Sequence, residues 1–107
     1  MAKRLKFVLF FAPQAIEHLD RIESKYHGLL RGTIKEQLTY APTEETRNRK
    51  PLDPPAPFAA SWELRCGPNN RWRVFYDVDA VSRVVQVLAI GVKDRSRLFI
   101  GGEEYES

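Results

Sequence analysis

Basic side chains recur in four separate stretches between residues 49 and 97. Arginine presents a planar, bidentate fork to phosphate oxygens, and lysine presents a compact positive charge. Such groups, when they converge from several segments, form a footprint for a nucleic-acid backbone. The residues concerned are Arg49 and Lys50, then Arg65, then Arg73, and finally Lys93, Arg95 and Arg97. Their pattern predicts an anion-binding site, provided that the fold brings them together.

Two of these arginines lie on predicted strands whose register can be derived. Residues 61–66 and 71–78 alternate between apolar and polar side chains, and residues 67–70 (Gly-Pro-Asn-Asn) are a turn signal. The two apolar sets share a face only if the connecting loop holds an odd number of residues, for example 67–71. The opposing pairs are then Leu64 and Val74, Trp62 and Tyr76, and Arg65 and Arg73.

The pairing of Arg65 with Arg73 has two explanations. Like charges directly across a pair of strands repel, with cross-strand terms of roughly 0.2–1 kcal/mol. A bound phosphate would relieve this repulsion. Alternatively, Glu63 and Asp77, which the alternation places on the same face, neutralise the arginines as a solvated polar surface. The residues by themselves leave both explanations open.

The N-terminal part of the chain predicts one strand and two helices. Residues 7–11 form a continuous apolar run, which suits a strand covered on both faces. Pro13 suits the first position of a helix, and Gly28 separates this helix from the next. Apolar residues recur at helical spacing, namely Ile16, Leu19 and Ile22 in the first helix and Leu30, Ile34 and Leu38 in the second, before Pro42. This is a helical hairpin that is amphipathic on both arms.

Beyond the hairpin, residues 42–60 form a long proline-stiffened connection from which Arg49 and Lys50 can close the basic site. Three strands follow, over residues 61–66, 71–78 and 84–90, and the last is almost wholly apolar and therefore central. The stretch 93–97 leaves the end of this central strand, where its side chains can reach the open face of the sheet. The order predicts a single α+β domain over residues 1–107, with the helices on one face of an antiparallel sheet.

The composition is that of one mildly basic globular domain. The chain has 107 residues, with 17 Lys and Arg against 14 Asp and Glu, for a net charge of +3. Cys66 is the single cysteine, so no intrachain disulfide forms, and no apolar run approaches the roughly 18 residues of a membrane helix. We therefore expect a cytoplasmic protein. His18, His27 and Cys66 have no metal-ligand spacing, so we expect neither a metal nor another cofactor.

Several short motifs together resemble the RelE/ParE toxin superfamily. They are residues 62–65 (Trp-Glu-Leu-Arg), 73–78 (Arg-Val-Phe-Tyr-Asp-Val), 87–91 (Val-Leu-Ala-Ile-Gly) and 93–96 (Lys-Asp-Arg-Ser). The order of elements is similar to that of the family over nearly the whole chain. The resemblance implies a toxin of a type II toxin–antitoxin system, made with a cognate antitoxin whose segment wraps the toxin and neutralises its basic surface.

RelE-like members of this family enter the ribosomal A site and cut messenger RNA without a metal. For this chain the resemblance implies an RNA-binding endoribonuclease that inhibits translation by attack of a ribose 2′-OH on the adjacent phosphate. The residues that match the family's active positions are Lys50, Arg65, Arg73, Lys93 and Arg95, with Arg49, Arg97 and Phe99 as further contacts to the substrate. Arginine cannot give up its proton, so the arginines hold and stabilise the phosphate. Lys50 or Lys93 is the candidate base, provided that adjacent cations disfavour its charged form.

One position departs from the family pattern. Several cutting members carry a tyrosine where this chain has Phe99, and phenylalanine has no proton to exchange. Phenylalanine at this position can still stack on an RNA base, but it cannot act as a general acid or base. ParE-like members share the fold but inhibit DNA gyrase without catalysis, which is the alternative function. A third alternative is a basic binding domain without toxicity.

Overall fold

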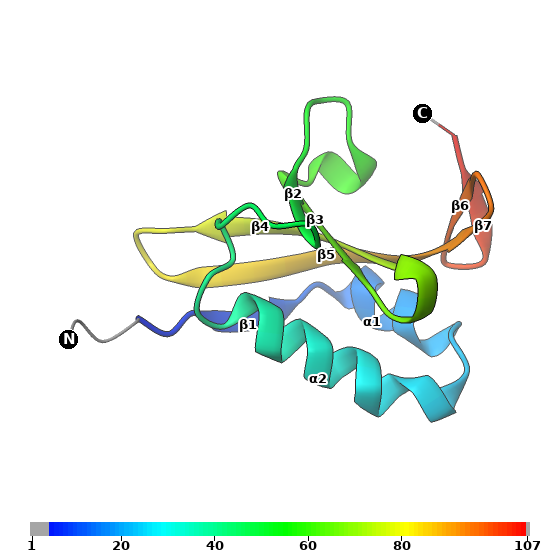
Figure 1. Ribbon diagram of the computed structural model, residues 1–107, viewed down its shortest axis with the longest axis horizontal. Coiled ribbons are helices and arrows are strands. Elements are labelled where there is room, and N and C mark those ends of the chain that lie inside the picture. The colour runs from blue at the N-terminus through cyan, green and yellow to red at the C-terminus, as the bar shows by residue number, and fades with distance from the viewer. Residues whose placement is uncertain (1–4, 107) are drawn as a thin grey trace.

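A computed structural model describes residues 5–106, and its elements follow the predicted order of strand, helical hairpin and antiparallel strands (Figure 1). Strand β1 (Val8–Phe11) precedes helices α1 (Pro13–Asp20) and α2 (His27–Leu38). The later strands are β2 (Arg49–Pro51), β3 (Trp62–Cys66), β4 (Trp72–Asp79), β5 (Val84–Asp94), β6 (Arg97–Ile100) and β7 (Glu103–Tyr105). Short 3-10 helices are η1 (Ser24–Tyr26), η2 (Pro57–Ala59) and η3 (Pro68–Asn70). The predicted α+β class is confirmed.

Within the described residues, seven strands form one mixed sheet. Strands β2 to β7 are adjacent in that order, and each pairs with the next in antiparallel fashion. β1 pairs in parallel with the first part of β5. The sequence pattern does not predict β2, β6 and β7, because strands of three or four residues are too short to show a repeated alternation.

The prediction that the first strand is covered on both faces is wrong. Val8 is 65% exposed and Phe10 is 56% exposed, whereas their neighbours along β1 are half-buried. The reason is that the helices cover only one face of the sheet at β1. A continuous apolar run therefore does not by itself imply two covered faces.

Both helices pack on one face of the sheet, as predicted (Figure 1). The side chains of Leu30, Ile34 and Leu38 from α2 are fully buried, together with Leu19 from α1. They meet the apolar side chains of the central strands, Leu64, Cys66, Trp72, Val74, Tyr76, Val85 and Val87. Gly28 lies inside α2, and the break between the helices falls just before it, at η1. None of the helices in residues 5–106 is long and apolar enough to cross a membrane.

The opposite face carries a second, smaller apolar cluster and is not open throughout. Phe75 and Ala89 are buried there together with Ala60 and Ile100. The cover comes from the connection between β2 and β3, which includes η2, and from β6 and β7 (Figure 1). The open part of this face is therefore smaller than the sequence suggests.

Helix α1 covers a short part of β5 that has no strand neighbour on the side away from β4. β1 pairs with the first part of β5 and β6 with the last part, which leaves the residues between them without a strand neighbour on that side. There, Gln14 Nε2 donates a hydrogen bond to Leu88 O at 3.1 Å, and the N–H of Ile90 donates to Nδ1 of His18 at 3.3 Å. The two side chains thus replace the missing strand and tie α1 to the sheet.

The surroundings of His18 lead us to expect that the stability of the fold depends on pH. Burial lowers the pKa of His18 below its ordinary value of 6.5, and the charge of Glu17 offsets part of this effect. The neutral ring, whose Nδ1 accepts the Ile90 hydrogen bond, is the stable form in the folded protein. Its contribution is fully present above pH 6.5. Below that value the unfolded chain takes up a proton that the folded protein does not, so the free energy of unfolding falls until the folded-state pKa is passed.

Chemical unfolding measured at several pH values between about 5 and 7.5 checks this expectation. The free energy of unfolding should decrease toward the acidic end of the range in the unsubstituted protein. In the His18→Gln variant, this decrease should be smaller because the titrating group is gone. Equal slopes in the two proteins would contradict the assignment to His18.

Candidate functional site

The predicted register of β3 and β4 is confirmed. Trp62 lies opposite Tyr76, Leu64 opposite Val74 and Arg65 opposite Arg73. The connection between the two strands spans residues 67–71, the odd length that the apolar faces require. Arg65 and Arg73 are therefore cross-strand neighbours on the face that the helices leave free.

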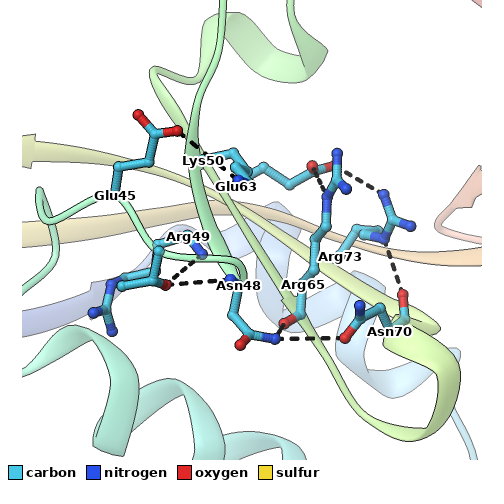
Figure 2. Close-up of polar contacts among 9 residues, drawn as sticks. Glu45, Asn48, Arg49, Lys50, Glu63, Arg65, Asn70 and Arg73 are labelled. Carbon is cyan, nitrogen blue, oxygen red and sulfur yellow. Dashed lines mark hydrogen bonds and ion pairs between the residues drawn. The ribbon is translucent and has the colours of Figure 1, made fainter.

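A glutamate connects the two arginines (Figure 2). Arg65 Nε is 2.8 Å from Glu63 Oε1, and Arg73 Nη1 is 3.5 Å from Glu63 Oε2. The Glu63 side chain is 9% exposed and the Arg73 side chain 13% exposed. Asp77, the other carboxylate expected to neutralise the arginines, instead accepts a hydrogen bond from the N–H of Ser61 at 2.7 Å. Glu63 alone of the two relieves the repulsion between the guanidinium groups.

Arg73, Lys93 and Arg95 line one hollow of about 490 Å³, which we call the basic hollow. Arg73 comes from β4, Lys93 from the end of β5 and Arg95 from the turn between β5 and β6. The other lining residues are Pro68, Asn69, Arg71 and Asp94. The cations outnumber the single carboxylate of the hollow, so it attracts anions.

Sequence reasoning missed Arg71 as a member of the basic hollow. Trp72 pairs with Val92, which places Arg71 beside Lys93, and the N–H of Lys93 donates to Arg71 O at 2.6 Å. The alternation over residues 71–78 already places Arg71 on the face of Arg73, but its position beside Lys93 depends on the pairing of β4 with β5. A register shift between Phe75 and Tyr76 separates the two halves of the β4–β5 pairing, and no local pattern shows where such a shift occurs.

Lys50 lies on the same face but does not line the hollow. It is the cross-strand neighbour of Glu63, and its Nζ is 3.9 Å from Glu45 (Figure 2). The structure thus brings Lys50, Glu63, Arg65 and Arg73 into one group, which we call the arginine cluster. Arg73 belongs to both the cluster and the basic hollow, so the two are continuous.

Arg49 is not part of the site, and the prediction that it helps to close it is wrong. Arg49 lies opposite Leu64, so the alternation along β2 turns its side chain toward the helices. There it is buried, and it donates from Nε to Glu44 O at 2.9 Å. Its Nη1 donates to O and Oε1 of Gln37 at 2.9 and 2.7 Å. Adjacent residues of a strand face opposite sides of the sheet, so Arg49 and Lys50 point in opposite directions. The prediction of a loop over residues 42–60 did not include this alternation.

Arg97 and Phe99 also lie outside the basic hollow, in contrast to the prediction. Phe99 pairs with Val92, whose side chain packs against the helix-covered core, so Phe99 belongs to that face and not to the face of Lys93. Arg97 is exposed and contacts Glu104 at 3.6 Å. The physical reason is that β6 is itself a strand, in which successive side chains alternate between faces.

Within residues 5–106, the cysteine and the carboxylate and histidine side chains add neither a thiolate nucleophile nor a metal site. Burial raises the pKa of Cys66 to about 12, and the charge of Arg73 offsets part of this effect, so the thiol stays protonated in the core. In the part of the chain that the structure describes, no group of three or more His, Cys, Asp or Glu side chains is placed to hold a metal ion. What the site offers chemically is positive charge, which binds an anion and stabilises negative charge as it develops.

Comparisons with known proteins bear on the fold. No model of a known protein family matches the chain, and no curated protein sequence matches it. A chain of the toxin–antitoxin complex RelBE2 from Mycobacterium tuberculosis matches in structure with a TM-score of 0.69, over 87% of this chain and 98% of that chain. The TM-score shows that the two chains share a fold, and their sequence identity is 19%. The chain therefore has the RelE-like fold that its sequence predicts.

Proposed function

We propose that this protein is the toxin of a type II toxin–antitoxin pair and that it cleaves ribosome-bound messenger RNA without a metal. The observation that carries the proposal is the basic hollow, in which Arg71, Arg73, Lys93 and Arg95 converge from separate segments beside Arg65. The RelE-like fold adds support. Cations gathered in this way bind a phosphodiester through charge-assisted hydrogen bonds.

In the proposed reaction, the 2′-oxygen of a ribose attacks the adjacent phosphorus, and the bond from phosphorus to the 5′-oxygen of the next nucleotide breaks. The hydroxyl proton passes to a base, and the leaving oxygen takes up a proton. We assign the base to Lys93, acting as the neutral amine, because Lys93 lines the hollow and Lys50 does not. Arg65, Arg73 and Arg95 keep their protons and stabilise the negative charge on the pentacovalent phosphate.

A cognate antitoxin is the protein partner that we infer. The matched structure is that of a toxin–antitoxin complex. Carboxylates of an antitoxin segment would pair with the guanidinium groups of the arginine cluster and the basic hollow, and so neutralise them. The other proposed partners are messenger RNA and the ribosome, and the proposed place of action is the cytoplasm.

Gyrase inhibition is the second candidate function, and the position of Phe99 favours it. Phe99 has no hydroxyl proton and lies on the face opposite Lys93, so it supplies neither an acid nor a stacking surface to the hollow. A protein that binds DNA gyrase without chemistry needs no such group. In this version the basic hollow contacts the acidic surface of its target and catalyses nothing.

A reconstituted translation reaction with a defined messenger RNA tests the proposal. The purified chain is added to translating ribosomes, and the ends of the RNA fragments are mapped. We expect cuts in ribosome-bound message and none in the same RNA without ribosomes. A supercoiling assay with purified gyrase runs in parallel. Intact message with blocked supercoiling would favour the gyrase inhibitor, and no effect in either assay would favour a basic binding domain without toxicity.

A further inference from the structure

Glu63 is a nearly buried carboxylate in a group of residues that otherwise consists of cations. Each of its two oxygens contacts one guanidinium group, that of Arg65 at 2.8 Å and that of Arg73 at 3.5 Å (Figure 2). A carboxylate in this position weakens the attraction of the cluster for phosphate. Burying it also carries a desolvation penalty. For anion affinity alone, Glu63 offers only relief of the repulsion between the two guanidinium groups, and it adds a negative charge that opposes phosphate binding.

The surroundings of the two arginines are held in place as well. Arg73 Nε donates to Asn70 O at 3.0 Å. The N–H of Arg65 donates to Asn48 O at 2.7 Å, and Asn48 Nδ2 donates back to Arg65 O at 3.0 Å. Within residues 5–106, these contacts and those to Glu63 leave Nη1 and Nη2 of Arg65 and Nη2 of Arg73 without a protein acceptor. These nitrogens remain available to a ligand.

We propose that Glu63 is the positioning residue of this site. It holds the two guanidinium groups in one arrangement, with their remaining N–H groups available to the oxygens of a single phosphate. The inference rests on the proposed function, because the phosphate in question is the one at which the RNA is cut. Glu63 acts through the arginines and takes no proton itself. Glu63 lowers the affinity of the site for phosphate but fixes the orientation of the two guanidinium groups, and this orientation matters most in the transition state.

Two substitutions separate orientation from charge. Glu63→Gln keeps the size of the side chain and removes the negative charge that orders the guanidinium groups. Glu63→Asp keeps the charge but withdraws the carboxylate from the two arginines. The matched control is Glu45→Gln, which also removes one negative charge from the same region. Glu45 contacts Lys50 and is not in contact with the two arginines.

The experiment measures RNA binding, single-turnover cleavage on the ribosome and the arginine Nε–H and Nη–H signals in nuclear magnetic resonance spectra. For binding, an RNA that lacks the attacking 2′-OH prevents cleavage. We expect Glu63→Gln to bind this RNA at least as tightly as the unsubstituted protein, yet to cleave about 10- to 100-fold more slowly. The Nε–H signal of Arg65 and the Nη–H signals of Arg73, whose nitrogens contact Glu63, should lose their separate positions in Glu63→Gln and keep them in Glu45→Gln. Glu63→Asp should show a partial loss of rate despite its unchanged charge.

The outcomes distinguish this inference from the proposed function. Cleavage by Glu63→Gln at or above the normal rate would overturn the positioning role and leave Glu63 as a competitor of phosphate. If the unsubstituted protein cleaves nothing, the proposed function fails, and the arginine signals still decide whether Glu63 orders the pair. Unchanged signals in a folded Glu63→Gln protein would overturn the inference. If Glu63→Gln does not fold, the same comparison is made with Glu63→Asp.

Discussion

Replacing Arg73 by alanine is expected to lower the rate of messenger RNA cleavage by at least about 100-fold, the usual effect of removing one donor that stabilises developing negative charge. Arg73 is the residue that the arginine cluster and the basic hollow share. Its Nη1 contacts Glu63 and its Nε donates to Asn70 O, so its guanidinium group is fixed before substrate arrives. Single-turnover cleavage of ribosome-bound message by Arg73→Ala measures the effect.

The matched control for Arg73→Ala is Arg31→Ala. Arg31 lies on α2, over the ring of Phe11 and on the helix side of the sheet, and its loss removes the same charge from the protein. Arg31→Ala should cleave close to the normal rate. Arg73→Lys keeps the positive charge without the planar fork, and we expect it to recover only a small part of the activity. Normal cleavage by a folded Arg73→Ala protein would remove the basic hollow from the mechanism.

Replacing Gly67 by alanine is expected to destabilise the fold by about 2–6 kcal/mol, from backbone strain and overpacking together. Gly67 has φ +79° and ψ −179°, a backbone conformation that is essentially confined to glycine. A Cβ added there would lie 2.5 Å from Cε3 of Trp72, which is 4% exposed and packed in the core. Neither the backbone at Gly67 nor the buried ring of Trp72 can move without a large energetic cost. The melting temperature should fall by at least about 10 °C, as measured by circular dichroism.

Gly28→Ala is the control for this substitution. Gly28 lies within α2, and a Cβ added there meets nothing within 4 Å. Alanine in a helix is favoured over glycine by about 0.5–1 kcal/mol, so Gly28→Ala should raise the melting temperature slightly. A Gly67→Ala protein that melts within a few degrees of the unsubstituted protein would show that the turn between β3 and β4 adapts, and that the strain argument is wrong.

Gly67 also links stability to the site. It opens the connection that carries Pro68, Asn69 and Arg71, all of which line the basic hollow. At low temperature, where part of the Gly67→Ala protein is still folded, its rate of RNA cleavage should therefore be lower than the loss of folded protein alone explains. This comparison requires the cleavage rate per folded molecule, which circular dichroism at the assay temperature supplies.

The sequence by itself determines the parts of the site that depend on residues close together in the chain. The pairing of Arg65 with Arg73 follows from two alternating strands and an odd connection, and the structure confirms it. Hairpin partners meet within a few residues of the turn, so the apolar faces and the turn length are sufficient to set their register. Helical spacing likewise predicts the buried positions Leu30, Ile34 and Leu38, whereas in the first helix it fails at Ile16, which is 41% exposed.

Only the tertiary structure decides which side chains from distant segments join the arginine pair. Arg49 and Phe99 turn to the helix-covered face because short strands pair at β3 and β5, and Arg71 enters the hollow because β4 is in register with β5. The double contact of Glu63 likewise depends on how both arginine side chains bend. Alternation along a strand predicts which of its residues lie on the same face of the sheet. Which side faces the site depends on pairings across the sheet that no local pattern encodes.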